Sequence, residues 1–142
     1  MEDLGHWLFE SNIDQEGAYG FIYEITNTFS GRKYIGKKQL FRTVTRAPLK
    51  GRKNKRKKLV ESDWRVYTGS CTDLNEDIEL LGKDRFEFRI ISLCGCKWEL
   101  AYEEAKLQFA LGVLLSSKYY NGIINCRVGN KPKHGTIKDK QV

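Results

Sequence analysis

One carboxylate of this 142-residue chain lies where an apolar side chain is expected. Residues 98–115 have the spacing of an amphipathic helix. Four leucines share one stripe of that helix: Leu100, Leu107, Leu111 and Leu114. Glu104 lies in the middle of the same stripe, where a carboxylate is costly unless it is paired or binds a metal ion. Glu104 is therefore an exposed residue on a mispredicted stripe, an ion-pair partner, or a functional acid.

Two tyrosines, Tyr23 and Tyr34, lie in a stretch that reads GFIYEITNTFSGRKYIGKK over residues 20–38. Residues 19–26 alternate between two faces, which predicts a strand. Residues 32–37 follow a Ser-Gly turn and predict the antiparallel return strand. Tyrosine is a common strand residue that usually packs, so this pattern alone does not indicate an enzyme.

The other elements that would position these side chains are helices at residues 38–48 and 72–81. The first would end at a proline and the second at a glycine. Residues 85–93 alternate and predict a third strand, and residues 123–127 predict one more short strand. We therefore expect a small α/β domain of the α+β type, with a mainly antiparallel three-stranded sheet flanked by helices.

The length suits one domain, and three segments are predicted along the chain. Residues 1–18 form an N-terminal arm with a short helical piece around residues 4–9. Residues 19–127 form the domain that carries the tyrosines and the acid. Residues 128–142 form a basic, loose tail.

The net charge of +7 comes from one segment. Residues 46–58 contain eight basic residues and no acid: Arg46, Lys50, Arg52, Lys53, Lys55, Arg56, Lys57 and Lys58. The rest of the chain has 17 Lys and Arg against 18 Asp and Glu. A block of like charge usually contacts a polyanion, and the alternative is a solvated loop. We expect a basic loop that contacts nucleic acid.

Four cysteines and two histidines do not have the spacing of a zinc site. Cys94 and Cys96 form C-x-C, which favours buried structural thiols over metal or redox work. No apolar run reaches the about 18 residues of a membrane span. The N-terminal MEDLGHWLFE also lacks the basic start of a signal peptide. We expect a cytoplasmic protein with reduced thiols.

Several motifs appear together and in order. They are Gly20-Phe21-Ile22-Tyr23, then Tyr34-Ile35-Gly36, then Gly82 followed by FEFRII, then the acidic helix, then Tyr120-Asn121. This set resembles the GIY-YIG nuclease family, with phenylalanine in place of one namesake glycine. YIGKK, SDWRVYTGS and YEEAKLQF resemble the small stand-alone members that phages encode. The resemblance runs from about residue 19 to residue 121.

The resemblance implies metal-dependent hydrolysis of DNA phosphodiester bonds. It places Tyr23 beside the attacking water, as general base or as its positioner, and Tyr34 as a hydrogen-bonding partner. It implies that Glu104 binds the single divalent ion, Mg²⁺ or Mn²⁺, and that waters complete the coordination shell of the ion. It assigns Asn121 to support of the site, with Asn125 as a weaker candidate.

Cations complete the site that the resemblance implies. Lys37 and Lys38 are candidates to lower the pKa of Tyr23 from about 10. The family usually carries a phosphate-clamping arginine about eight residues past the YIG glycine, where this chain has Val44. We assign that role to Arg42.

DNA is the expected partner, and a homodimer would allow both strands to be cut. The chain has no room for a separate DNA-binding domain, and the basic loop alone would give salt-dependent, sequence-blind affinity. Trp64 and Tyr67 are predicted to pack rather than to stack on bases. The main alternative is a nucleic-acid-binding module that keeps the fold without the chemistry. A third reading is a protein that binds an acidic partner through the basic loop.

Overall fold

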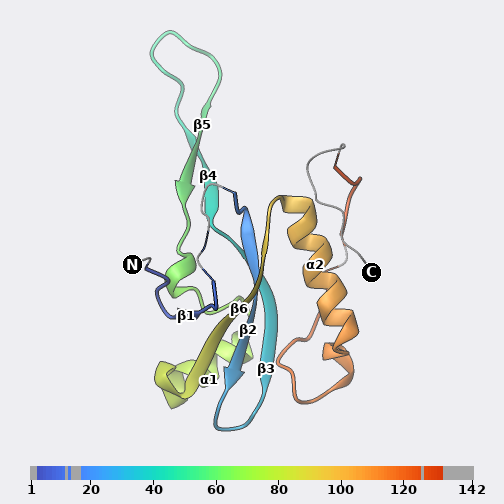
Figure 1. The fold of residues 1–142 in the computed structure, drawn as a ribbon. Helices are drawn as coiled ribbons and strands as arrows, with labels where there is room; N and C mark the ends of the chain where they lie inside the picture. The colour runs from blue at the N-terminus through green and yellow to red at the C-terminus, as the bar shows by residue number, and fades with distance from the viewer. Residues whose placement is uncertain (1–2, 12, 14–16, 126, 133–142) are drawn as a thin grey trace.

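The computed structural model describes residues 3–11, 13, 17–125 and 127–132 (Figure 1). Its main sheet has four strands in the order β1-β6-β2-β3. The strands are β1 (Trp7–Leu8), β2 (Gly20–Asn27), β3 (Lys33–Gln39) and β6 (Phe86–Cys94). β2 pairs antiparallel with both β3 and β6, whereas β1 pairs in parallel with β6. The α+β class with a mainly antiparallel sheet is therefore confirmed, with one more strand than predicted.

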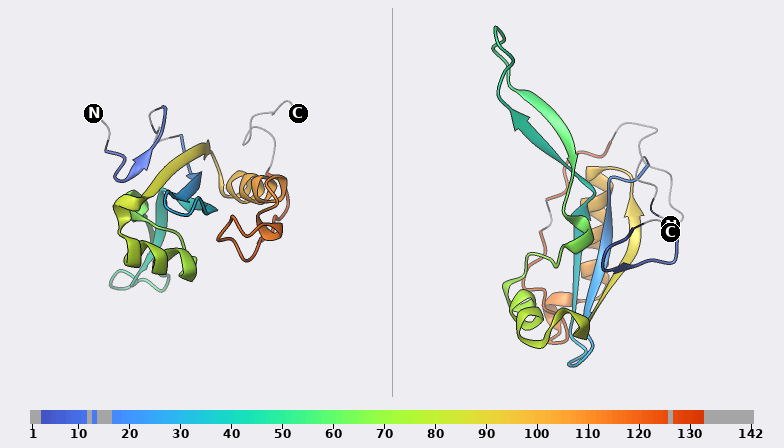
Figure 2. Two further views of the ribbon diagram at one scale, coloured as in Figure 1. Left: turned by 90° about the horizontal axis from the view of Figure 1, so that it is seen from below. Right: turned by 90° about the vertical axis from the view of Figure 1, so that its left-hand side faces the viewer.

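The central strand β2 is buried on both of its faces. Phe21, Tyr23 and Ile25 belong to one apolar cluster, which also contains Leu74 of α1 (Thr72–Leu81). Ile22 belongs to a second cluster, which contains Leu100 of α2 (Lys97–Ala110). The sheet is therefore a middle layer, with α1 on one face and α2 on the other (Figure 2).

Both helices were predicted, and a glycine sets the end of each. Gly82 follows α1 with a φ of 94°, a conformation that favours glycine. α2 ends at Ala110, a few residues before the predicted end, and Gly112 then adopts a left-handed conformation. The lower part of the predicted stripe is consequently outside the helix, and Leu111 and Leu114 are exposed.

The helix predicted over residues 38–48 is wrong. β3 continues through Lys38 to Gln39, and β4 (Phe41–Arg46) then pairs antiparallel with β5 (Arg56–Glu61). These two strands form a separate two-stranded sheet, which projects from the body as a ribbon (Figures 1 and 2). The Thr-Val-Thr run of β4 explains the difference, because β-branched residues favour strands over helices. Pro48 lies in the tip of the ribbon, outside both strands.

Two smaller predictions at the ends of the chain are also wrong. The piece around residues 4–9 contains β1 rather than a helix, and Trp7 is buried in the core. The short strand predicted over residues 123–127 is absent from residues 123–125. Residue 126 of that predicted strand lies outside the described residues, as do residues 133–142 of the predicted tail. Among the described residues, no helix is long and apolar enough to cross a membrane.

Candidate active site

A cavity of about 240 Å³ lies beside β3, the edge strand of the main sheet. Five site candidates predicted from the sequence line it together: Tyr23, Tyr34, Lys37, Glu104 and the weaker candidate Asn125. Its other lining residues are Tyr67, Ser70, Gln108 and Ile123. The cavity therefore gathers phenols from two adjacent strands, a carboxylate and an amide from α2, and groups from two loops.

Gly36 explains how Tyr23 reaches this cavity. The two residues are cross-strand partners in the β2–β3 ladder. A Cβ atom on Gly36 would lie 2.4 Å from the Tyr23 hydroxyl oxygen and 3.0 Å from Cε2 of Tyr34. The phenol of Tyr23 thus occupies the space that a side chain at position 36 would fill. The glycine of the second motif is needed for the two tyrosines to lie together, with ring centroids 6.2 Å apart.

Glu104 is buried, with 9% of its surface exposed, so it is not an exposed residue on a mispredicted stripe. Burial raises the pKa of its carboxyl, and nearby Lys37 opposes that rise. The nearest distance between the Lys37 ammonium and the Glu104 carboxylate is 4.0 Å. This is a loose ion pair, because the two groups are far apart for an ion pair and the Lys37 side chain is 42% exposed to solvent.

Burial raises the pKa of Tyr23 well above its usual value, and the neighbouring Tyr34, Tyr67 and Glu104 raise it further. The expectation that Lys37 and Lys38 lower this pKa is therefore wrong for the protein without bound ions. Lys38 instead lies 2.7 Å from the Asp63 carboxylate and over the ring of Tyr67. Tyr23 is a protonated phenol at neutral pH, able to donate a hydrogen bond.

Asn121 binds the outer edge of β3. Its side-chain oxygen accepts from the Ile35 backbone N–H at 3.0 Å, and its amide donates to the Ile35 carbonyl at 2.8 Å. It replaces a neighbouring strand at that position, which satisfies the buried backbone of the edge. Asn121 thus positions β3, while Asn125 rather than Asn121 lines the cavity.

Gln108 is a cavity residue that the sequence analysis missed. Its amide nitrogen donates to the Ile35 carbonyl at 2.9 Å, and the residue is only 4% exposed. Its side-chain oxygen is buried without a hydrogen-bond partner among the described residues. Gln108 follows Glu104 by one helical turn, so the i, i+4 spacing could have identified it.

Two of the predicted cations lie outside this cavity. Lys38 and Arg42 line a neighbouring cavity of about 220 Å³, together with Lys37, Gln39, Ser62 and Leu100. Arg42 is exposed at the base of the ribbon. Within the described part of the chain, no arginine lines the first cavity. Lys37 is the residue that both cavities share.

The groups in the cavity suit one hard divalent ion. In the described residues, no three His, Cys, Asp or Glu side chains cluster as a metal-binding group. Mg²⁺ commonly uses one or two protein oxygens and keeps several waters, so a single carboxylate is sufficient. Glu104 would hold the ion, and the unpartnered Gln108 oxygen is an acceptor for a water bound to it.

Comparison with protein families gives one match. The family described as "Putative endonuclease segE, GIY-YIG domain" matches residues 7–124. Neither a curated protein nor a solved structure matches the chain. The matched region includes the whole cavity apart from Asn125, as well as the ribbon. Because this match covers most of the sequence, the chain belongs to the SegE-type GIY-YIG endonuclease-domain family.

Proposed function

We propose that the protein is a divalent-metal-dependent endonuclease that hydrolyses DNA phosphodiester bonds with Mg²⁺ or Mn²⁺. The observation that carries this proposal is the buried Glu104, which lies in one cavity with Tyr23, Tyr34 and Lys37. Burying a carboxylate lowers the stability of the fold, and such a loss is expected where the carboxylate is a functional group. Packing alone would favour an apolar residue at this position.

The roles follow from the geometry and the charges. A divalent ion on Glu104 would supply positive charge to a phosphate oxygen and would activate a bound water. Lys37 offers an ammonium for the same phosphate, because it lines the cavity and its side chain is partly exposed. The raised pKa of Tyr23 favours its role as positioner of the attacking water over that of general base. Gln108 and Asn121 hold β3 in place under the two phenols.

Supercoiled plasmid incubated with Mg²⁺ or with EDTA tests this proposal. Glu104→Gln should lower the nicking rate at least about 100-fold, and Tyr23→Phe should cost about as much. Glu103→Gln is the matched control, since it removes a neighbouring carboxylate from the same helix outside the cavity. Nicking that continues in EDTA, or that survives Glu104→Gln at the parent rate, would contradict the proposal.

A DNA-binding module without cleavage is the second candidate. The observation in its favour is that Arg42 lies outside the first cavity and that no other arginine of the described ranges lines it. This candidate predicts salt-dependent DNA binding without nicking under any divalent ion. The same plasmid assay, repeated with Mg²⁺ and Mn²⁺, separates the two.

A further inference from the structure

The ribbon of β4 and β5 carries its charge on one face. Cross-strand partners point to the same side, and successive pairs alternate between sides. One side, which we call face A, consists of Arg42, Val44, Arg46, Arg56, Lys58 and Val60. The opposite side, face B, consists of Phe41, Thr43, Thr45, Lys57, Leu59 and Glu61. Face A thus has four cations and no acid, while face B has one of each.

We infer that face A of the ribbon binds the major groove of duplex DNA beside the cleavage site. The inference rests on the proposed function in that DNA is taken as the substrate. A two-stranded ribbon fits the B-form major groove, which is about 12 Å wide. Each six-residue strand spans roughly 20 Å. The ribbon is thus long enough to follow the groove over several base pairs.

Like charges on the ribbon indicate a polyanionic partner. Arg46 and Arg56 are direct cross-strand partners, an arrangement that destabilises an isolated hairpin. Lysines on exposed strand edges also prevent aggregation, but that purpose does not require one sign on one face. Phosphates along a groove would relieve the repulsion between Arg46 and Arg56, and would favour cations gathered on face A.

The chemistry of face A favours a DNA duplex over other nucleic acids. Proteins that bind single strands offer aromatic rings on which bases stack, and residues 42–60 contain no aromatic residue. Phe41, at the base of the ribbon, belongs to face B. The major groove of duplex RNA is deep and too narrow for side chains to read.

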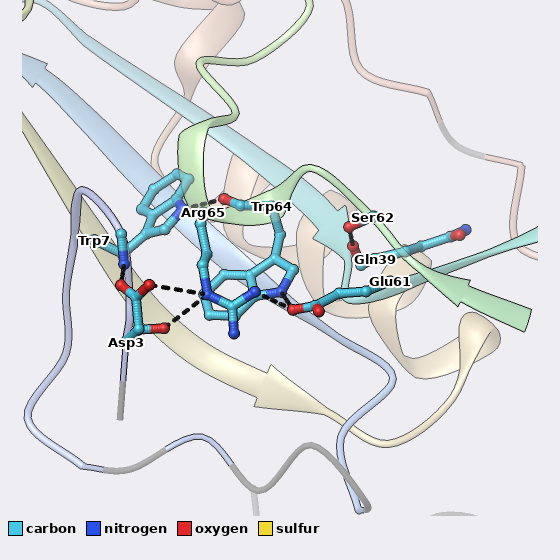
Figure 3. Close-up of polar contacts among 8 residues, drawn as sticks. Asp3, Trp7, Gln39, Glu61, Ser62, Trp64 and Arg65 are labelled. Atoms are coloured by element: carbon cyan, nitrogen blue, oxygen red, sulfur yellow. Dashed lines mark hydrogen bonds and ion pairs between the residues drawn. The ribbon is translucent and has the colours of Figure 1, made fainter. Parts of the chain in front are cut away.

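The base of the ribbon is held firmly to the body (Figure 3). The Ser62 hydroxyl donates to the Gln39 carbonyl at 2.6 Å, which joins the chain after β5 to the end of β3. Glu61 accepts from the indole of the fully buried Trp64 at 3.0 Å and pairs with Arg65. Arg65 also donates to the Asp3 carbonyl at 2.9 Å. Face A therefore keeps a fixed direction relative to the sheet at its base.

Face A also continues toward the candidate active site. Arg42, the first cation of this face, lines the second cavity together with Lys37. Lys37 in turn lines the first cavity with Glu104. A cationic path therefore runs from the proposed scissile phosphate through Lys37 and Arg42 to the outer part of face A.

The test compares two adjacent lysines of β5 that are both exposed and differ in face. Binding of the full chain to a labelled 30-base-pair DNA duplex is measured by fluorescence anisotropy in EDTA over a salt series. Lys58→Gln on face A should weaken binding roughly fivefold to tenfold at 0.1 M salt and lower the salt slope by about one. Lys57→Gln on face B should weaken binding less. The change in the logarithm of its dissociation constant should be less than half of the change for Lys58→Gln.

A double variant, Lys58→Gln with Thr43→Lys, moves one charge from face A to face B without changing net charge. The inference predicts that this variant binds as weakly as Lys58→Gln alone. Parent-like binding of the double variant, or equal losses for Lys57→Gln and Lys58→Gln, would overturn it. Duplex RNA or the single strand bound as tightly as the DNA duplex would overturn it as well.

Changes in stability or in cleavage can be separated from changes in DNA binding. The substituted residues are exposed on the ribbon, so the melting temperature of each variant should match that of the parent. Binding in EDTA is read without cleavage. A protein that fails to nick plasmid but shows the face-dependent loss would contradict the proposed function alone. A nicking protein without that dependence would contradict only the ribbon inference.

Discussion

The proposed role of Glu104 in catalysis comes at a cost to the stability of the fold. Its carboxyl is buried beside one exposed lysine, and burial raises its pKa in the folded protein. The folded state therefore binds a proton more tightly at this site than the unfolded chain does. Ionised Glu104 destabilises the fold above its folded pKa, and the cost disappears as the pH falls toward the ordinary value of a glutamate.

Glu104→Gln should consequently raise the free energy of unfolding at pH 7 while it abolishes nicking. The gain should shrink as the pH is lowered through the folded pKa of Glu104, because the parent carboxyl then becomes neutral like the amide. Urea denaturation at several pH values measures this difference. A variant less stable than the parent at pH 7, or a gain that grows at acidic pH, would contradict the raised pKa.

Gln108 gives a second prediction at the residue scale. In Gln108→Leu the Ile35 carbonyl keeps the hydrogen bond from Asn121, so stability should change by less than about 1 kcal/mol. The variant loses the acceptor that we place beside a metal-bound water. The Mg²⁺ concentration for half-maximal nicking should rise about 10-fold or more. An unchanged Mg²⁺ dependence would assign Gln108 to packing alone.

At the scale of the element, β3 organises the site. Its inner edge brings Gly36 against Tyr23, and its outer edge is held at Ile35 by Asn121 and Gln108. Both contacts fix the strand within the same few residues. A small displacement of β3 would therefore move Tyr34 and Lys37 together and change their distance from the phenol of Tyr23 on β2.

Gly36→Ala tests this dependence on close approach. The new methyl group would meet the buried ring of Tyr23, so the variant should lose about 1–3 kcal/mol of stability and melt several degrees lower. Gly122→Ala is the matched control, because no atom lies within 4 Å of its added Cβ and it needs no positive φ. Equal melting temperatures for the two variants would show that β3 adapts easily.

The elements also show which features the sequence could predict. α1, β2, β3 and β6 were predicted because their apolar periodicity and terminal glycines are local signals. The anomalous position of Glu104 on α2 was also visible in the pattern. The ribbon was mispredicted, because its cations hide the alternation of β4 and β5, which appears only once the two strands are paired. The contacts of Asn121 and Gln108 with Ile35 join residues more than 70 positions apart, which no local pattern reveals.

For the whole molecule, the charges divide between two parts. Residues 46–58 carry the entire positive excess, and the rest of the chain is close to neutral. We therefore propose that the body holds the chemistry and that the ribbon supplies the attraction to DNA. Most of the DNA affinity, and most of its salt dependence, should come from the ribbon.

A footprint should separate these two parts along the DNA. Val44, the cross-strand partner of Lys58, lies seven residues beyond Lys37, which corresponds to at most roughly 23 Å of extended chain and at most about seven base pairs. Hydroxyl-radical footprints are recorded in Ca²⁺ for the parent and for Lys58→Gln. The DNA bound by Lys58→Gln should be less protected than the DNA bound by the parent, near that distance from the cut. Protection lost at the cut itself, or evenly along the site, would contradict the placement of face A.

The central claim is that Glu104 holds one divalent ion beside the phenols of Tyr23 and Tyr34. Crystals grown with Mn²⁺ and a cleavage-resistant DNA test it most directly, through the anomalous signal of the metal. We predict one peak inside the cavity, roughly 2.1 Å from a carboxylate oxygen of Glu104, which disappears in Glu104→Gln. A peak at another residue, or one that persists in Glu104→Gln, would contradict the account.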